Sequence, residues 1–289
     1  MPAFDALTMP DATIPIGRVA YSGKFMSLAN GVDGRLMRHL RHFTSPEKDV
    51  YQFGVFTGTG LRKIVKELKG AYGHVWGFDS FQGLPPDSSS ETESWRHPKT
   101  GAYKDHFLQG GYSAANALGS TSLRGVMRQV RERVGGHNVT LVPGFFNESL
   151  TDDLPKKLRM RSALHVDMDA DLYVSAIDAL DWMFRHRLIV PSTFIRYDDW
   201  PRVNATFGPA KGTNFFGQCR AHYELSIKYD VTWKLVAKNS LQVLSIGRER
   251  CAPAICDGVA SMHTLFPWAA DGLPHLPMWG LPTSRNGLC

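Results

Sequence analysis

Short apolar runs alternate with helical patterns between residues 35 and 245, and this alternation constrains the fold more than any other feature. Runs typical of strands lie at 49–56, 74–81, 138–146, 163–169 and 192–200. Apolar residues with the i, i+3, i+4 spacing of helices lie between them at 59–70, 121–136 and 174–188. This repeat predicts an α/β fold with a Rossmann-like, doubly wound, mostly parallel sheet.

The last two apolar runs, 231–238 and 241–247, are separated by only two residues. Such a short connection requires an antiparallel pair, so we expect the sheet to close with an antiparallel strand. We expect three parts: a helical or irregular N-terminal segment over 1–48, a catalytic or binding domain over 49–248, and an irregular tail over 249–289. The tail has five prolines after residue 250 and is expected to pack on the body or on a partner subunit, which leaves a homo-oligomer open.

Composition narrows the class of protein. With 43% hydrophobic and 21% charged residues, the chain is typical of a soluble globular protein. No apolar stretch approaches the 18 residues of a membrane span, and no secretory signal precedes the first strand. The cysteines lack metal-site spacing, which favours free thiols and a cytoplasmic location; they are Cys219, Cys251, Cys256 and Cys289.

The net charge of +6 leaves nucleic acid open as a partner. The densest basic runs, 35–42 and 124–133, have helical apolar spacing, so solvated helix faces explain them better than a nucleic-acid surface. The segment 84–120 is rich in Pro, Ser and Gly, and we expect it to form a long loop or lid after the second strand.

A glycine-rich turn follows the first predicted strand, with Gly54, Gly58 and Gly60. In doubly wound sheets, ligands lie beyond the carboxyl ends of the strands, where small residues let the backbone approach them. Asp79 ends the second predicted strand, where an acid can accept hydrogen bonds from ribose hydroxyls. The alternative for Asp79 is a turn or helix-capping acid. Three classes of nucleotide-binding protein fit such a turn: P-loop proteins, short-chain dehydrogenases and methyltransferases. The chain lacks the lysine of a P-loop and the Tyr-x-x-x-Lys pair of a short-chain dehydrogenase, which leaves methyl transfer.

Three acids, Asp167, Asp169 and Asp171, alternate where the strand at 163–169 ends. Alternate residues of a strand point to the same side, so these carboxylates would repel one another unless a positive group lies between them. One interpretation is a metal ion. The other is that the acids are solvated loop residues that end the strand.

Several segments, in chain order, resemble the macrocin O-methyltransferase (TylF/MycF-type) family of class I S-adenosylmethionine-dependent methyltransferases. They are "GVFTGTG", "FDSFQGLPP", "GGYSA", "LVPGFFNESL", "DADLYVSAIDAL" and "YDDW". The resemblance covers roughly residues 50–216 and implies a methyltransferase domain over 49–248. It also implies S-adenosylmethionine as donor, a magnesium ion, and as acceptor a hydroxyl of a small molecule, from a sugar or polyketide. Asp167 is an addition to the family pattern.

With this resemblance, a metal site can be assigned. Asp198 and Asp199 end the next strand, 29 residues beyond Asp169, and neighbouring parallel strands lie about 5 Å apart. We therefore expect Asp169, Asp198 and Asp199 to ligate Mg²⁺, with Asp167 or Asp171 replacing Asp169 if the register differs. In an ion-free reading, Asp198 and Asp199 cap the loop that follows.

Donor contacts are also expected from the resemblance. Gly54, Phe56, Thr57 and Gly58 would border the methionine part. Asp79 would bind the ribose, with Ser80 and Phe81 at the ribose and adenine edge, and Gly144 and Phe145 at the adenine. Core packing is the alternative for Phe81 and Phe145.

Asp169 is the expected catalytic base, which would take the proton of the acceptor hydroxyl; His97, His106 and His222 are alternative bases. The segment 84–120 and the tail would form the acceptor walls. Two competing functions stay open: an RNA or protein methyltransferase that needs no metal, and a non-catalytic protein that binds S-adenosylmethionine.

Overall fold

The computed structural model describes residues 37, 40–41, 45–68, 70–86, 109–198, 217–237 and 239–250. The strands are β1 (Asp49–Phe53), β2 (Val75–Asp79), β3 (Val139–Pro143), β4 (Ala163–Met168), β5 (Phe194–Tyr197), β6 (Val231–Ala237), β7 (Ser240–Ile246) and β8 (Glu249–Arg250). The helices are α2 (Thr59–Leu68), α3 (Ala114–Leu118), α4 (Leu123–Val134), α5 (Phe146–Ser149), α6 (Leu154–Leu158), α7 (Tyr173–Arg185) and α9 (Gly217–Lys228).

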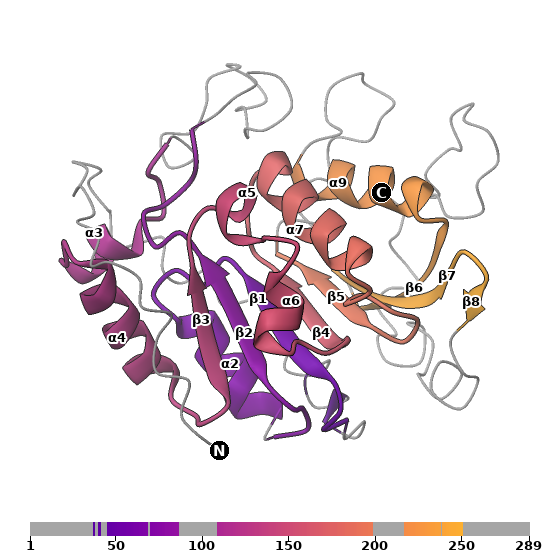
Figure 1. Ribbon diagram of the computed structural model, residues 1–289, viewed down its shortest axis with the longest axis horizontal. Helices are drawn as coiled ribbons and strands as arrows, with labels where there is room; N and C mark the ends of the chain where they lie inside the picture. The colour runs from indigo at the N-terminus through magenta and orange to yellow at the C-terminus, as the bar shows by residue number, and fades with distance from the viewer. Residues whose placement is uncertain are drawn as a thin grey trace, which may run out of the picture.

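One twisted sheet runs through the molecule in the order β3-β2-β1-β4-β5-β7-β6, with β8 paired to β7 (Figure 1). Strands β1 to β5 are parallel, whereas β7 is antiparallel to both β5 and β6. The order reverses at β1 and β4, which is where a doubly wound sheet opens a crevice for a ligand. The predicted α/β class, with a mostly parallel sheet and an antiparallel closing strand, is confirmed.

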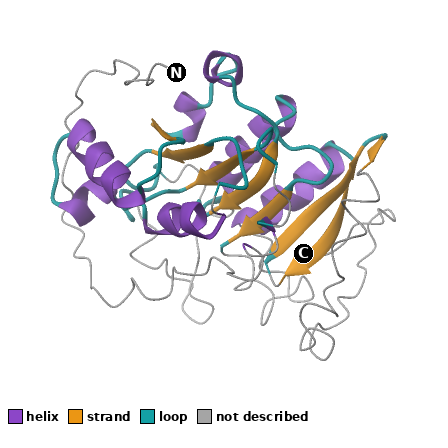
Figure 2. Cartoon of the chain, turned by 90° about the horizontal axis from the view of Figure 1, so that it is seen from below, coloured by secondary structure: helices purple, strands orange, loops and turns teal. Residues whose placement is uncertain are grey.

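Helices cover both faces of the sheet (Figure 2). On one face, α2 and α4 bury Leu61, Ile64, Val126 and Val130 against the strands. On the other face, α7 and α9 pack on Tyr51, Phe53, Phe78 and Ile195, with Trp182 of α7 fully buried. All five residues of β1 are buried because helices cover both faces of the sheet. Three of these residues are apolar, and the polar Asp49 and Gln52 are hydrogen-bonded to Trp76 and Asp167. No helix among the described residues is long and apolar enough to cross a membrane.

The first three strands end earlier than their apolar runs predict. The run at 49–56 leaves the sheet after Phe53 because Gly54 and Phe56 have positive φ angles of 85° and 50°. The run at 138–146 ends at Pro143, since Gly144 turns the chain at φ 129° and Phe146 begins α5. In both places the glycine conformation redirects the chain toward the carboxyl edge of the sheet.

Within the described part of the chain, four helices were not predicted. α3 lies within the expected loop 84–120, between an N-cap at Ser113 and a left-handed C-cap at Gly119. α5 and α6 are too short to show a helical period. The buried face of α9 carries Gln218, His222 and Ser226, which obscure its apolar period. Residues 87–108 of the expected loop 84–120 lie outside the described residues, as do most of the expected N-terminal segment 1–48 and all but the first two residues of the expected tail 249–289.

Candidate active site

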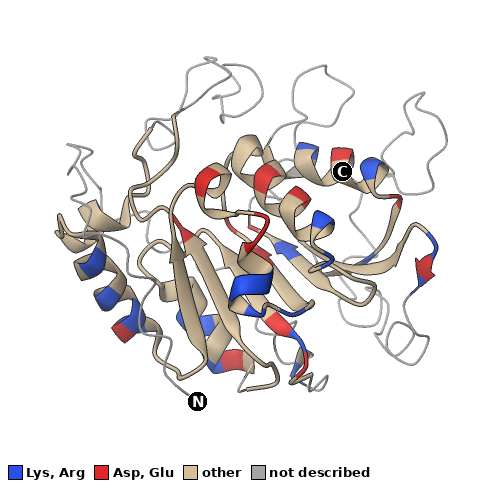
Figure 3. Cartoon of the chain, in the orientation of Figure 1, with Lys and Arg blue, Asp and Glu red and all other residues tan. Residues whose placement is uncertain are grey.

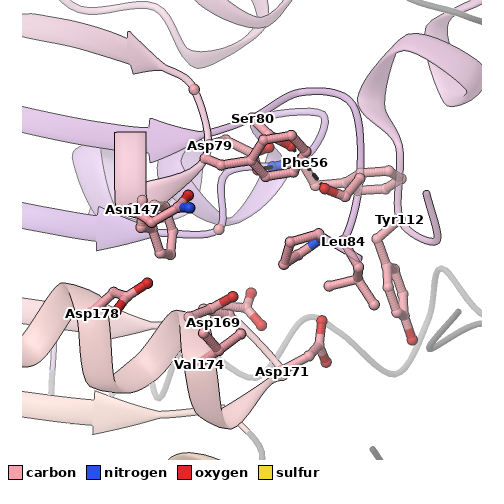
Figure 4. A pocket seen from close by; sticks show the side chains of 18 of the residues that line it. Phe56, Asp79, Ser80, Leu84, Tyr112, Asn147, Asp169, Asp171, Val174 and Asp178 are labelled. Atoms are coloured by element: carbon pink, nitrogen blue, oxygen red, sulfur yellow. Dashed lines mark hydrogen bonds between the residues drawn. The ribbon is translucent and has the colours of Figure 1, made fainter. Parts of the chain in front are cut away.

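A cavity of about 540 Å³ opens at the carboxyl ends of the central strands (Figure 4). The loops after β1 and β2 and the start of α5 form one wall, and the β4–α7 connection forms the opposite wall. Its described lining consists of Gly54, Phe56, Asp79, Ser80, Gly83, Leu84, Pro85, Pro86, Tyr112, Gly144, Phe145, Phe146, Asn147, Glu148, Asp169, Ala170, Asp171, Val174, Ser175, Asp178 and Asp198.

Gly54 allows the ends of β1 and β4 to meet. A Cβ atom at this position would lie 1.8 Å from the backbone oxygen of Asp169, and the φ angle of +85° disfavours any other residue. The Gly54 amide donates to the Phe78 oxygen of β2 at 2.9 Å, and the Asp169 amide donates to the Phe53 oxygen of β1 at 2.9 Å. The three strand ends are therefore joined by backbone contacts at the edge of the cavity.

Asp79 stabilises the turn after β1. Its carboxylate accepts hydrogen bonds from the backbone amides of Val55 at 2.8 Å, Phe56 at 2.7 Å and Phe81 at 2.6 Å. Burial raises the pKa of Asp79, and the three amides oppose this shift because they stabilise the carboxylate. Asp79 thus has the turn role considered as an alternative, and it also lines the cavity, where the ribose role stays a prediction.

Most of the predicted donor residues lie in the cavity wall. Phe56 packs edge-on to Tyr112, with 6.4 Å between ring centroids, and Ser80, Gly144 and Phe145 are also part of the lining. In Figure 4, Phe56, Asp79 and Ser80 face Asp169 and Asp171 across the open space. This arrangement leaves room for an elongated ligand between the β1–β2 side and the β4–α7 side.

Thr57, Gly58 and Phe81 lie outside the lining of the cavity. Gly58 faces α4 instead, since a Cβ there would lie 2.9 Å from Val134 Cγ2. Phe81 is fully buried in the core on the α2 side, as the core-packing alternative stated. Thr57 is buried, and its Oγ1 lies 3.5 Å from the Oγ1 of Thr59.

Asp169 and Asp198 come together at the ends of β4 and β5, as the strand spacing predicted. The Asp198 amide donates to the Met168 oxygen at 3.0 Å, and both carboxylates line the cavity. Burial raises the pKa of Asp169 well above its usual range. The negative charges of Asp198, Asp167 and Asp171 add to this shift of the Asp169 pKa, and Arg196 opposes it.

Asp167 has a different environment from Asp169. It is buried beneath the cavity, where Oδ1 accepts from Arg196 Nη1 at 2.5 Å and Oδ2 accepts from Gln52 Nε2 at 3.1 Å. Asp167 does not line the cavity, whereas Asp171 does, with a positive φ of 49° before α7. The alternating spacing of these acids in the sequence therefore did not reveal that Asp167 is buried beneath the cavity, whereas Asp169 and Asp171 line it.

The donor set fits a hard divalent cation in part. The carboxylates of Asp167, Asp171 and Asp198 all repel that of Asp169, and the guanidinium of Arg196 offsets part of this negative charge. The Asp169 side chain accepts no hydrogen bond from the described residues, so its charge is poorly compensated there. Oxygen ligands of this kind suit Mg²⁺. Asp199, the third predicted ligand, lies outside the described residues, within which no cluster of three candidate ligands has metal-site geometry.

Sequence reasoning missed several lining residues on α7 and α5. Val174, Ser175 and Asp178 face the cavity because they recur at the helical spacing from Asp171, and Figure 4 shows Asp178 at the edge of this space. Asn147 and Glu148 of α5 line the opposite wall. The α7 residues could have been predicted from the sequence, because they follow Asp171 at the i+3, i+4 and i+7 positions of a helix.

Of the alternative bases, only His222 lies among the described residues. It is buried on α9, outside the cavity lining, with its Nδ1 3.0 Å from the hydroxyl of Tyr197. Burial lowers the pKa of His222 to about 3, so this imidazole is neutral near pH 7. His97 and His106 lie outside the described residues.

Comparison with known proteins gives one family match. The model of the macrocin O-methyltransferase (TylF) family matches residues 47–207. No curated protein sequence matches the chain at a significant level.

Solved structures are similar to this chain at low identity. The calicheamicin methyltransferase CalS11 is 18% identical over 75% of this chain and 79% of its own, with a TM-score of 0.44. Cofactor-bound Rv0187 from MTB is 14% identical over 81% and 84%, with a TM-score of 0.41. An O-methyltransferase from Bacillus cereus in complex with SAH is 13% identical over 74% and 80%, with a TM-score of 0.37.

Proposed function

The chain belongs to the macrocin O-methyltransferase (TylF) family, and from this premise we propose that it is a Mg²⁺-assisted enzyme that methylates a hydroxyl of a small molecule. One observation carries the proposal: Asp169 and Asp198, from neighbouring strands, line the same cavity as Gly54 and Asp79. A proposed cation site and a proposed donor site therefore share one space of about 540 Å³, which is a typical volume for a small-molecule site.

The β1–β2 side of the cavity is the proposed donor side. S-adenosylmethionine, when bound, supplies the methyl group from its sulfonium. Gly54 would let the backbone approach the ligand, and Asp79 would accept hydrogen bonds from the ribose while it stabilises the turn at Val55 and Phe56. Ser80, Gly144 and Phe145 would border the remainder of the donor.

The β4–β5 side is the proposed acceptor and metal side. Asp169 and Asp198, with Asp199, would hold Mg²⁺, which lowers the pKa of a hydroxyl that ligates it. Asp169 accepts the hydroxyl proton as the oxygen–carbon bond forms and the sulfur–carbon bond breaks, leaving S-adenosylhomocysteine. The two walls of the cavity fix the acceptor relative to the donor, and this positioning contributes to the rate.

The charge of the cavity supports a small acceptor without phosphate groups. Its described lining includes six acidic residues and no basic one; the acids are Asp79, Glu148, Asp169, Asp171, Asp178 and Asp198. Figure 3 shows acidic residues near the carboxyl ends of the central strands, whereas α4 on the outside carries several arginines. A polyanion such as RNA would be repelled from the cavity, so we favour the small-molecule acceptor over RNA.

The test combines donor binding, metal dependence and turnover. We expect the full chain to bind S-adenosylhomocysteine in calorimetry, and to methylate members of a panel of neutral glycosides and polyketide alcohols. EDTA should abolish this activity and MgCl₂ restore it. Asp169→Asn should lower turnover by about 100-fold or more, because it removes both a base and a ligand. Its affinity for S-adenosylhomocysteine in EDTA should stay within about threefold.

Asp153→Asn is the matched control, because Asp153 is an exposed carboxylate at the N-cap of α6, outside the cavity lining, where it accepts a hydrogen bond from Thr151 Oγ1. It should behave like the parent chain. Turnover that persists in EDTA and in Asp169→Asn would contradict the magnesium and base roles. Failure to bind S-adenosylhomocysteine would contradict the donor assignment.

A further inference from the structure

A buried row of polar side chains crosses three neighbouring strands just beneath the cavity. Gln52 of β1 pairs in register with Asp167 of β4, which pairs in register with Arg196 of β5. All three side chains are at most 2% exposed. Two residues further along β4 and β5, the chain reaches Asp169 and Asp198 in the cavity wall. The ligands of the proposed cation site thus lie directly above a buried polar layer.

Arg196 connects the two layers. Its Nη1 donates to Asp167 Oδ1 at 2.5 Å, and its Nη2 donates to Asp198 Oδ1. Asp167 is held from its other side by Gln52 Nε2 at 3.1 Å. Residues two apart on a strand point to the same side, which is why the guanidinium of Arg196 can reach Asp198 without leaving its strand.

The planar guanidinium is well suited to this connection. It presents donors in a fixed fork, so one nitrogen can bind Asp167 while the other fixes the position of Asp198. Asp169 has no such partner among the described residues. The two acids of the cavity wall therefore differ. One carboxylate oxygen of Asp198 is bound by Arg196 from beneath the cavity, whereas the carboxylate of Asp169 has no such hydrogen bond from the described residues and faces the cavity.

Stability alone does not account for this buried ion pair. Replacing a buried pair by apolar side chains of similar volume is often neutral or stabilising, and Arg196 Nε has no hydrogen-bond partner among the described residues. The presence of a buried, partly unsatisfied guanidinium beneath the proposed cation site is better explained if Arg196 orients the Asp198 carboxylate, a proposed ligand of the cation.

We propose that Arg196 is a positioning residue, anchored by Asp167 and Gln52, that orients the Asp198 carboxylate for a divalent cation in the cavity. This inference rests on the proposed function, because it takes Asp198 as a cation ligand. It also accounts for Asp167 as the anchor of Arg196 rather than a ligand.

The test measures Mg²⁺ affinity by calorimetry on the full chain saturated with S-adenosylhomocysteine. In Arg196→Lys the positive charge remains, but an ammonium group lacks the fork that holds both carboxylates. We expect the Kd for Mg²⁺ to rise by about 10- to 100-fold. Where an acceptor is methylated, excess MgCl₂ should restore the kcat of this variant, which a purely structural defect would not allow.

A second variant guards against misfolding of the first. The double substitution Asp167→Leu with Arg196→Met removes the pair without changing the local net charge, and apolar replacements of this kind usually fold. It should weaken Mg²⁺ binding to a similar extent as Arg196→Lys.

The control is Asp49→Asn, at the opposite end of β1. Asp49 is also buried, and it accepts hydrogen bonds from Trp76 Nε1 at 2.9 Å and the Arg161 amide at 3.0 Å. This variant should lower the melting temperature but leave the Kd for Mg²⁺ within about twofold.

The outcomes separate the two proposals. If the parent binds Mg²⁺ and both Arg196 variants bind it equally well or more tightly, the role of Arg196 is refuted and the proposed function stands. An equal loss of affinity in Asp49→Asn would also refute it, by tracing the effect to stability. If the parent chain binds no Mg²⁺, the magnesium part of the proposed function fails, and the role of Arg196 fails with it.

Discussion

Gly54 shows how a single residue can determine the shape of the site. Its φ of +85° turns the chain out of β1, and the missing side chain lets the Asp169 oxygen approach from β4. The sequence predicted a glycine-rich ligand turn from the residues at 54, 58 and 60. It did not distinguish their roles, because Gly58 faces α4 and only Gly54 lines the cavity.

Gly54→Ala places a Cβ against the Asp169 oxygen at a backbone conformation that disfavours alanine, so we expect a loss of about 3 kcal/mol or more in the free energy of unfolding. Affinity for S-adenosylhomocysteine should fall at least tenfold. Urea unfolding and calorimetry measure the two effects.

Gly70→Ala is the matched control for this change. Gly70 has a similar φ of +80°, but no described atom lies within 4 Å of the position that a Cβ would occupy, so only the backbone strain of about 1 kcal/mol applies. The two variants should differ clearly in stability and in ligand affinity. Equal losses would show that the contact with Asp169 is unimportant.

At the scale of elements, α7 combines two functions along its length. Its first turns place Val174, Ser175 and Asp178 at the cavity, and its later turns bury Trp182 and Met183 in the core. Trp182 donates from Nε1 to the Thr151 oxygen at 3.0 Å and packs on Phe78 with 6.0 Å between centroids. The apolar period predicted this helix over 174–188, close to the observed bounds, since its packing face is continuous.

Trp182→Ala should therefore destabilise the fold without changing the site. We expect the free energy of unfolding to fall by about 3–5 kcal/mol, because a large buried side chain leaves a cavity. In the folded protein, affinity for S-adenosylhomocysteine should stay within about twofold. Ile227→Ala on α9, where the side chain is 56% exposed, should change stability by less than about 0.5 kcal/mol. A large loss of ligand affinity in Trp182→Ala would argue against this division of α7.

At the scale of the whole molecule, a buried neutral histidine links folding to pH. His222 of α9 packs between Tyr197 of β5 and Trp233 of β6, and burial lowers its pKa to about 3. The unfolded chain binds a proton here near pH 6.5, whereas the folded chain does not. Between these two values the unfolded state holds more protons, so the free energy of unfolding falls as the pH is lowered.

We expect His222 to contribute a loss on the order of 2 kcal/mol between pH 7.5 and pH 5. Urea unfolding at both pH values measures it, and His222→Phe should reduce the difference by a similar amount. The exposed His137 has no such burial, so His137→Asn should keep the parent's pH dependence. A His222→Phe variant with the same pH dependence of stability as the parent chain would contradict the assignment.

The sequence by itself determined the sheet, the antiparallel closing pair, the glycine turn and the acids at the ends of β2, β4 and β5. These features follow from short-range rules, since alternation, helical spacing and turn residues are local properties. Only the tertiary structure decided which acid is buried in an ion pair and which acid lines the cavity. Asp167 and Asp169 are equivalent by spacing, yet Arg196 and Gln52, from neighbouring strands, bind the first and leave the second at the cavity. Burial and partners arise from contacts between distant segments, and no local pattern encodes them.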